Sequence, residues 1–429
     1  MKFCILTLGC KVNSYESDYI KERFIAKSYE QATISDNPDV VVVNTCSVTN
    51  QSDAKSRHMI RLARRECPNA CLVVCGCSAQ NHQEKLSSLG IDILIGNKDK
   101  SKIVELVEEY MVNHKKVSNF YDMSDVPFED MALKNETDKT RAFVKIQDGC
   151  NNFCSYCIIP FLRGNIRSKD IDLAESEIRE LVKNGHREIV LTGIHTGSYG
   201  TNKDYDLVDL IRRISKIDDL ERIRISSIEI TELNDKFLTE LEHNKKICNH
   251  LHIPLQSGST EILKKMNRKY DAKYYREKIS KIRSIRPNIS ITTDLIVGFP
   301  YETDELFEET YRFIEEIGFT KVHTFPFSLR SHTAAENMVL YFVDERVKKE
   351  RVKRILELSS KLENAYYTKQ IGMHEKLIVE VEKNGISKGH TSNYVLVTVD
   401  ESLEEGKTYD VLITSVDGQV VNGIVEKVE

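Results

Sequence analysis

The cysteines are the residues whose type and spacing point most directly to chemistry. Cys150, Cys154 and Cys157 form a CxxxCxxC cluster within the stretch GCNNFCSYC. Thiolates this close together on a loop can converge on one metal site, and iron–sulfur clusters are held by Cys thiolates. Because only three Cys are present here, a four-iron cluster would keep one iron open to a substrate or cofactor. The alternative is a structural zinc knuckle with a distant fourth ligand.

Three further cysteines are far apart in sequence but occupy equivalent places in a predicted sheet. Cys10, Cys46 and Cys77 each follow an apolar, strand-like run, in LTLGC, VVVNTC and VVCGC. Since the C-terminal ends of parallel strands form one rim at which ligands bind, these thiols would meet there. The alternative is three unrelated buried cysteines, and spacing alone does not decide between the two. Cys75 would point away from Cys77 on extended backbone, so we interpret it as a bystander.

Other catalytic motifs are absent from the sequence. No HExxH, GxxxxGK[ST] or GxSxG segment occurs. His252 and His323 lie on predicted strands, and we interpret them as core or pocket-lining groups rather than metal ligands. Two three-thiol sites favour one-electron chemistry, because neither hydrolysis nor proton transfer needs two iron–sulfur clusters. The remaining cysteines are interpreted as structural: Cys4, Cys67, Cys71 and Cys248.

Length and composition limit the class of protein. At 429 residues and roughly 150 residues per domain, the chain has room for about three domains. Its 40% hydrophobic and 30% charged residues exclude a disordered or collagen-like protein. No apolar run approaches the roughly 20 residues of a membrane span, and the start MKFCILTLGC has no signal-cleavage site. The 11 Cys, an odd number, do not suit a disulfide framework. We therefore expect a cytoplasmic protein without a membrane partner.

The elements that must position these cysteines fall into three regions. Apolar runs at 3–9, 40–44, 71–76 and 92–96 alternate with amphipathic stretches, which predicts a doubly wound parallel sheet over residues 1–118. A polar segment at 119–138 is the predicted linker. Six further strands with helical patterns between them predict a partial (β/α)6 barrel over 139–368, although pattern alone does not exclude an open sheet. Short alternating strands at 369–429 predict a small all-β barrel.

These motifs together resemble the radical S-adenosylmethionine (SAM) methylthiotransferases, and the resemblance covers essentially the whole chain. CxxxCxxC followed by IIPFLRGNIRS is similar to the radical-cluster loop of that family. The family's further barrel motifs match LTGIHTGSYG, HIPLQSGSTEILKKMNR and TTDLIVGFPYET. The resemblance implies a radical SAM barrel and a C-terminal RNA-binding TRAM domain. It also implies two 4Fe-4S clusters, one on Cys150, Cys154 and Cys157 and an auxiliary one on Cys10, Cys46 and Cys77.

Within this family, TLGCKVNSYES is similar to the branch that acts on N6-threonylcarbamoyladenosine, immediately 3′ of the tRNA anticodon. The isopentenyladenosine branch typically shows TFGCQMN there. HTFPFSLRSHTAA also resembles the first branch, but His332 occupies a position that is usually Gly, where a positive φ costs little. The alternatives are an isopentenyladenosine tRNA or ribosomal-protein substrate, or a non-catalytic iron–sulfur RNA-binding protein.

The resemblance implies radical chemistry. No side-chain base usefully deprotonates adenine C2 at neutral pH, so replacing that hydrogen by sulfur requires a radical. Reductive cleavage of SAM at the first cluster would give a 5′-deoxyadenosyl radical that removes the hydrogen. A methylated sulfur on the auxiliary cluster would then be transferred. The implied partners are the tRNA anticodon loop and an electron donor such as flavodoxin or ferredoxin, and the sulfur donor is not indicated.

Contacts to SAM and RNA are suggested by position. Gly193, Ser227, Gly298 and Phe299 follow predicted strands, where barrel enzymes bind ligands, and the alternative is turn glycines and a cap. Gly258, in QSGS, has the same two interpretations. The net charge of −5 does not indicate nucleic acid, but residues 264–286 carry ten Lys or Arg against two acids. They form either a phosphate-contacting face or solvated helices. Asn393-Tyr394 offers an aromatic ring on which a base could stack.

Overall fold

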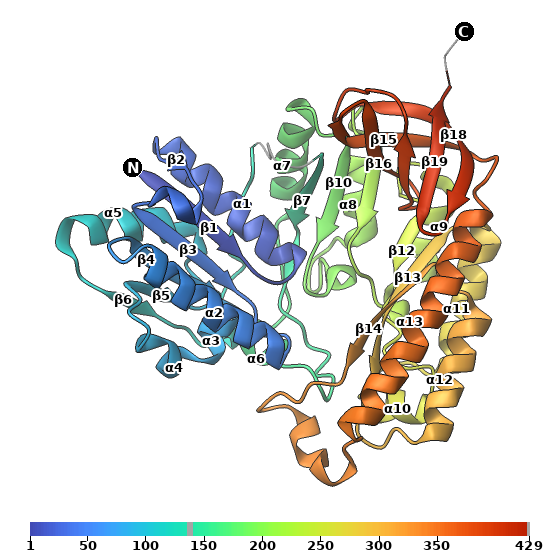
Figure 1. Cartoon of the computed structure of the whole chain (residues 1–429), viewed down its shortest axis with the longest axis horizontal. Helices are drawn as coiled ribbons and strands as arrows, with labels where there is room; N and C mark the ends of the chain where they lie inside the picture. The colour runs from blue at the N-terminus through green and yellow to red at the C-terminus, as the bar shows by residue number, and fades with distance from the viewer. Residues whose placement is uncertain (135–139, 427–429) are drawn as a thin grey trace.

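The computed structural model describes residues 1–134 and 140–426, in three parts that follow one another along the chain (Figure 1). An N-terminal parallel sheet with helices, blue to cyan, is followed by a central incomplete barrel, green to orange. A small closed β-barrel, red, ends the chain. This architecture confirms the predicted fold class.

The N-terminal part is a six-stranded sheet in which every pairing is parallel, in the order β2-β1-β3-β4-β5-β6. Its strands are β1 (Lys2–Thr7), β2 (Glu30–Gln31), β3 (Val40–Thr45), β4 (Cys71–Gly76), β5 (Ile93–Ile95) and β6 (Val117–Asn119). Its helices are α1 (Lys11–Ala26), α2 (Asn50–Glu66), α3 (Cys77–Asn81), α4 (Gln83–Ser87) and α5 (Ile103–Asn113).

Strand β3 shows why this sequence forms a sheet covered on both faces. Val40 and Val42 pack into one apolar cluster, whereas Val41 and Val43 pack into another on the opposite face. A continuous valine run suits this position because successive side chains point to opposite faces. The edge strands β2 and β6 have only two and three residues, too few for an alternating pattern, and the sequence did not predict them.

The central part consists of two three-stranded parallel sheets, ordered β11-β10-β7 and β12-β13-β14. A parallel bridge between Ile223 and Ile247 connects them into one incomplete barrel, as predicted. The strands are β7 (Arg141–Lys145), β10 (Glu188–Thr192), β11 (Arg222–Ile225), β12 (His250–His252), β13 (Ser290–Val297) and β14 (Lys321–Pro326). A short hairpin adds β8 (Gln147–Asp148) and β9 (Arg167–Ser168). The helices are α6 (Ile159–Arg163), α7 (Ile171–Lys183), α8 (Leu207–Ile214), α9 (Asp235–His243), α10 (Thr260–Lys265), α11 (Ala272–Ile285), α12 (Asp304–Ile317) and α13 (Glu345–Thr368).

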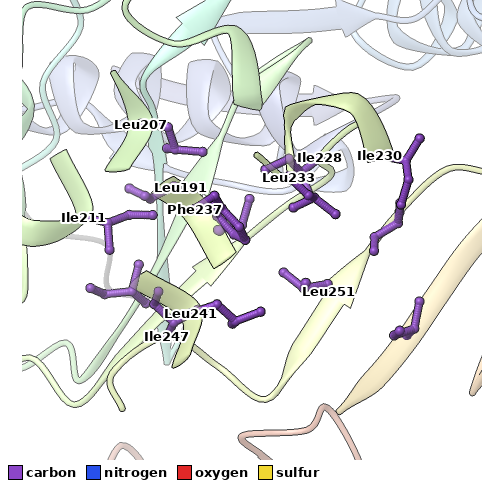
Figure 2. Packing of buried hydrophobic residues seen from close by; sticks show 14 of the residues in the cluster. Leu191, Leu207, Ile211, Ile228, Ile230, Leu233, Phe237, Leu241, Ile247 and Leu251 are labelled. Atoms are coloured by element: carbon purple, nitrogen blue, oxygen red, sulfur yellow. The ribbon is translucent and has the colours of Figure 1, made fainter. Parts of the chain in front are cut away.

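The core of the central part lies between the sheets and the surrounding helices. Figure 2 shows Leu191 of β10 and Leu251 of β12 near apolar side chains of α8 and α9, including Ile211 and Leu241. Helix starts are fixed locally, because the side chain of Asn234 accepts a hydrogen bond from the Phe237 amide (2.9 Å) at the start of α9. The helices cover the outer face of each sheet, and polar side chains lie on the opposite, concave face.

The C-terminal part is a closed barrel in the order β15-β16-β17-β19-β18. Its strands are β15 (His374–Lys383), β16 (Ile386–Thr391), β17 (Leu396–Val399), β18 (Thr408–Asp417) and β19 (Val420–Val425). Alternate residues such as Leu377, Val397 and Val411 fill its interior. Arg222 of the central part donates to the carbonyl of His390 (3.0 Å), so the two parts are in contact.

The predicted linker at 119–138 lies partly outside the described residues, as does its boundary with the second domain. In the described stretch, Met131 and Leu133 are buried in the central core. The Leu133 amide donates to Glu177 (2.9 Å), and the Tyr15 hydroxyl of α1 donates to the carbonyl of Met131. This stretch is therefore packed between the first two parts. Among the described helices, none is both long and apolar enough to cross a membrane.

Candidate active site

The first three predicted thiols lie at the C-terminal ends of β1, β3 and β4, which are neighbours in the sheet. Cys10 is the residue before α1, Cys46 follows β3, and Cys77 is the first residue of α3. A Cβ on Gly9, whose φ is +112°, would lie 3.0 Å from the Cys46 sulfur. Burial, together with nearby Cys77 and Cys10, raises the pKa of Cys46 to about 11. The structure therefore brings the three thiols together at one rim, with Cys10 exposed and the other two buried.

A buried arginine lies beside this group of thiols. Arg163, at the end of α6, donates from Nε to Cys77 Sγ (3.4 Å). Its Nη1 donates to Glu16 Oε1 and Asp148 Oδ1 (both 3.1 Å), and its Nη2 donates to Asn13 Oδ1 (2.7 Å). Arg163 thus binds α1 and the rim of the N-terminal sheet to the central part.

Glu16 is the centre of the same charge network. It is fully buried, pairs with Lys145 (2.8 Å), and contacts Lys100 and Arg163. Burial favours the neutral acid, but Arg163, Lys100 and Lys145 hold the Glu16 pKa well below its usual range. A buried carboxylate with three cationic partners is therefore ionised and binds the N-terminal part to β7.

The second group of thiols lies in the loop between β8 and α6. The Cys157 amide donates to the carbonyl of Cys154 (2.9 Å), and the Cys150 amide donates to the carbonyl of Gly164 (3.0 Å). Burial raises the pKa of Cys157 to about 12, and neighbouring Cys154 contributes in the same direction. The loop thus places Cys154 and Cys150 close enough to disfavour ionisation of Cys157.

Two side chains from the barrel contact these thiols. Arg268 donates from Nη1 to Cys154 Sγ (3.3 Å) and also binds Glu229. His195 pairs with Glu232 (2.6 Å). Burial lowers the His195 pKa, but hydrogen bonds to Cys150 and Glu232 raise it to about 10. A cationic group therefore lies beside the thiols of this loop, as Arg163 does beside Cys77.

The two groups of thiols are adjacent. Helix α6 begins two residues after Cys157, and its Leu162 packs with Ile158 and Cys77 in one apolar cluster. Asn97 donates to the carbonyl of Leu162 (3.0 Å) and to Cys77 Sγ (3.6 Å). The short helix α6 thus lies between the two sites and touches both.

The donors suit iron–sulfur clusters better than a single ion. Within residues 1–134 and 140–426, no three His, Cys, Asp or Glu side chains are close enough to bind one metal ion. A cluster of several irons holds its thiolates farther apart than one ion does. The guanidinium groups of Arg163 and Arg268 would also stabilise the charge of thiolate ligands. The surroundings of the thiols therefore fit such clusters.

Cys75 lies on the other face of β4 from this site. It is fully buried in the apolar cluster that contains Phe24 and Ile103, whereas Cys77 packs against Ile158 and Leu162. Burial raises the pKa of Cys75 to about 12. The described placement agrees with its interpretation as a bystander. The other four cysteines, Cys4, Cys67, Cys71 and Cys248, are also buried.

The residues predicted to contact SAM lie just after the barrel strands β10, β11 and β13. Gly193 follows β10, and a Cβ there would meet Gln147 Oε1 at 2.8 Å. Ser227 follows β11 and is partly exposed. Gly298 donates to Glu302 (2.8 Å), and buried Phe299 packs edge-on against Tyr156 (6.4 Å). Their contacts with a cofactor stay predictions.

The structure also bears on His332 and on Gly258. His332 adopts a φ of +66°, the conformation expected of the Gly it replaces, and its amide donates to Glu336 (2.9 Å). Gly258 packs tightly, because a Cβ there would lie 2.7 Å from Phe313 Cβ. Gly258 is therefore explained by close packing.

The suggested RNA-binding features are largely engaged within the chain. The Tyr394 ring stacks against His250 (4.9 Å) and His390 (4.7 Å), although the residue stays 37% exposed. Of the basic stretch, Arg276 pairs with Glu316 (2.6 Å) and Lys281 with Asp235 (2.7 Å). These contacts favour the interpretation of solvated, structural helices over a dedicated phosphate face.

The sequence reasoning missed Arg163, Arg268, His195 and Glu16. Arg163 stands in IIPFLRG, where a charged residue ends an apolar turn directly after the CxxxCxxC loop. That position was the one local signal. Nothing in the sequence alone indicated that Glu16 is buried, because its partners lie at positions 100, 145 and 163.

Fold and thiol geometry together define an incomplete β/α barrel with a CxxxCxxC loop, joined to a second thiol site on a separate sheet. Residues 144–314 match the radical SAM superfamily, and residues 2–96 match an uncharacterized protein family designated UPF0004. The chain is also similar in structure to the radical SAM methyltransferase TsrM from Kitasatospora setae. That similarity has a TM-score of 0.58 at 12% identity, over 90% of this chain and 77% of that one. At this identity it supports the fold alone.

Curated relatives cover nearly the whole chain. Threonylcarbamoyladenosine tRNA methylthiotransferase MtaB of Bacillus subtilis is 41% identical over 91% of this chain and 88% of its own. The protein of that name from Aquifex aeolicus is 38% identical over 96% and 100%. A tRNA-2-methylthio-N(6)-dimethylallyladenosine synthase of Clostridium perfringens is 33% identical over 94% and 92%. The chain belongs to the radical SAM methylthiotransferase family, in its MtaB-like group.

Proposed function

We propose that this chain attaches a methylthio group to C2 of N6-threonylcarbamoyladenosine beside the anticodon of tRNA, with SAM as co-substrate. The higher identity to the MtaB relatives than to the dimethylallyladenosine synthases supports this substrate. The observation that carries the proposal is the contact of the two thiol groups through α6, where Arg163 reaches Cys77 Sγ (3.4 Å). If sulfur is transferred to a carbon radical, the same adenine must lie within reach of both sites.

The proposed ligands of the two 4Fe-4S clusters are Cys150, Cys154 and Cys157 for one and Cys10, Cys46 and Cys77 for the other. When bound, the first would supply the electron that cleaves SAM, and the second would hold the sulfur to be transferred. Each set has three thiols, which leaves an iron open for SAM or for sulfur. The proposed SAM contacts remain Gly193, Ser227, Gly298 and Phe299, by their position after barrel strands.

The chain's own residues prepare this site in two ways. Arg163 and Arg268 donate to cysteine sulfurs, so each would place a positive charge beside the ligands of a bound cluster. Helix α6 and the Glu16 network fix the distance between the sites, because each lies on a different part of the chain. The tRNA anticodon loop is the proposed macromolecular partner. The proposed electron donor is a flavodoxin or ferredoxin, since cleavage of SAM needs a low-potential electron.

Separate variants test the division of labour. Anaerobically reconstituted Cys154→Ala should retain iron at the N-terminal site, form no 5′-deoxyadenosine and give no product. Cys46→Ala should still cleave SAM but transfer no sulfur. Cys75→Ala, a buried thiol two residues from Cys77, is the matched control and should keep the iron content and turnover of the unsubstituted chain. Loss of SAM cleavage in Cys46→Ala with the barrel cluster intact would contradict separate roles.

Substrate identity needs its own measurement. Nucleosides from tRNA of a deletion strain should lack the methylthio form of N6-threonylcarbamoyladenosine, as measured by mass spectrometry. Loss of the methylthio isopentenyl form instead would assign the other tRNA substrate. Unchanged tRNA with no 5′-deoxyadenosine formed in vitro would favour a non-catalytic iron–sulfur RNA-binding protein.

A further inference from the structure

A polar cavity lies where the N-terminal part meets the loop that follows β14. Its volume is about 320 Å³, and all eight described residues that line it are polar or charged. Three of them are cations from three different elements: Arg57 of α2, Lys85 of α4 and Arg330 of the loop. Among these described lining residues, Asp53 supplies the one carboxylate. We call this site the junction cavity.

Arg330 contacts both parts of the chain at this cavity. It is 4% exposed. Its Nη1 donates to Asn50 Oδ1 (2.6 Å), and its Nη2 donates to Ser47 Oγ (3.0 Å) and Asp53 Oδ2 (2.5 Å). All three acceptors belong to the N-terminal part. The N–H on Nε of Arg330 is buried without a hydrogen-bond partner among the described residues. Because a buried donor without an acceptor is costly, this guanidinium favours binding of a further acceptor.

Two other cations of the cavity have no counter-ion in the part of the chain that the structure describes. Arg57 is half-buried and Lys85 is exposed, and neither makes a hydrogen bond or an ion pair there. The Asp53 carboxylate is already engaged, because it pairs with Arg330 (2.5 Å) and with His82 (3.1 Å). A cleft lined mainly by one sign of charge concentrates ions of the opposite sign, so the junction cavity favours an anion.

The chemistry of the lining narrows the class of anion. An apolar molecule or a stacked base would find no apolar wall, because every described lining residue is polar. A carboxylate has two oxygens in one plane, whereas a phosphate group has several acceptor oxygens that point in different directions. Cations that approach from α2, α4 and the loop after β14 suit the second arrangement. The planar donors of arginine also match phosphate. The lining therefore fits a phosphate group.

The junction cavity adjoins the rim of thiols in the N-terminal part. Asp53 Oδ1 accepts a hydrogen bond from Ser47 (2.7 Å), the residue after Cys46. Ser56, next to Arg57 in α2, donates to the carbonyl of Cys46 (3.0 Å). The base to be modified is proposed to reach this rim, and each nucleotide carries a backbone phosphate close to its base. A phosphate of the RNA strand would therefore pass near the cavity.

We propose that Arg57, Lys85 and Arg330 bind one phosphate group in the junction cavity, supplied by the backbone of the RNA substrate. The phosphate chemistry depends on the cavity alone, whereas its RNA source rests on the proposed function. Free inorganic phosphate has the same chemistry, so the experiment separates the two sources. A phosphate bound there would contact both the N-terminal and the central part, and so would position the RNA strand beside the rim that its base must reach.

The test removes charge from the cavity and leaves Arg330 in place. The double variant Arg57→Gln/Lys85→Gln alters two side chains that have no partners among the described residues. The matched control, Lys55→Gln/Lys115→Gln, removes the same charge from two exposed lysines that do not line the cavity. Iron content and circular dichroism are compared for each reconstituted protein, so that a change in fold or metal content is recognised before binding is measured.

Two ligands are titrated into each reconstituted protein. One is inorganic phosphate, with binding measured by isothermal titration calorimetry. The other is an anticodon stem-loop with N6-threonylcarbamoyladenosine, with the dissociation constant measured at several salt concentrations. In a further set of stem-loops, each loop phosphate in turn is replaced by a neutral methylphosphonate. This replacement removes one negative charge and keeps the strand continuous.

We expect the double variant to bind the stem-loop about 10-fold more weakly than the unsubstituted chain, because charged hydrogen bonds are lost. The slope of the logarithm of affinity against the logarithm of salt concentration should become shallower by about 1, since one phosphate contact is removed. One methylphosphonate beside the modified adenosine should weaken binding to the unsubstituted chain but not binding to the double variant. The control should behave as the unsubstituted chain does.

Equal stem-loop affinity and salt dependence in the unsubstituted chain and the double variant would exclude the RNA strand as the source. Binding of inorganic phosphate that is lost in the double variant would then assign the cavity to free phosphate. No difference with either ligand would overturn the proposal, and so would equal weakening in the control, which would show a general effect of charge. If the unsubstituted chain binds the stem-loop without methylthiolating it, the proposed function fails, and the methylphosphonate comparison still tests the cavity.

Discussion

Replacing Arg163 by Met should separate the N-terminal sheet from the barrel. The substitution keeps an unbranched side chain but removes a fully buried guanidinium that donates to Glu16, Asp148, Asn13 and Cys77. Removing one member of a buried ion network typically costs about 3–5 kcal/mol, because the remaining charges lose their partner. Lys100 and Lys145 still bind Glu16, so we expect the lower end of this range, about 3 kcal/mol.

Denaturant unfolding of the apoprotein, monitored by circular dichroism and limited proteolysis, measures this loss. The matched control is Arg179→Met, which removes an exposed pair with Glu175 and should cost less than about 1 kcal/mol. In the reconstituted protein, Arg163→Met should reduce the iron retained by the N-terminal site more than that of the barrel site. Equal stability of Arg163→Met and Arg179→Met would refute the assignment of Arg163 as the element that joins the two parts.

Three further perturbations follow from the contacts. Burial opposes ionisation of Glu188, but Arg224 and Arg222 lower its pKa to about 2. The contribution of ionised Glu188 to the free energy of unfolding is therefore complete above about pH 4.5 and is lost as the pH falls toward 2. The free energy of unfolding of Glu188→Gln should depend less on pH across that window. His332→Gly should raise the free energy of unfolding by up to about 1 kcal/mol, as thermal denaturation would show, because Gly adopts the positive φ without strain; a lower value would contradict this. Leu241→Ala should destabilise by about 2–5 kcal/mol in urea unfolding, since Leu241 is fully buried in the core of Figure 2; a change below 1 kcal/mol would refute tight packing there.

Local pattern predicts the N-terminal sheet, whereas it leaves the barrel and the rim of thiols open, and the resemblance to a known family favours them. The valine run at 40–43 can only be buried on both faces, and a cysteine directly after such a strand must lie at its C-terminal end. Strands of two or three residues, such as β2 and β6, have no such pattern and depend on their neighbours in the sheet.

Side-chain partners from distant positions could not be predicted in the same way. Glu16 lies in a polar stretch of α1, and its burial depends on Lys100, Lys145 and Arg163 arriving from three other segments. For the same reason the sequence suggests Tyr394 as a ring on which a base could stack. It does not indicate that His250, from the barrel, and His390 stack against that ring.

The proposed function requires two sites on separate parts of the chain to act on one base, and the junction between the first two parts joins those sites. A flexible connection would let the distance between Cys77 and Cys157 vary, and loss of alignment by about 1 Å can reduce rate about 100-fold. Here Arg163 donates to Cys77 Sγ from the end of the helix that follows Cys157. The segment with Met131 and Leu133 packs at the same junction. The buried charges at this junction have partners in both parts, so they would hold the geometry that the proposed reaction requires.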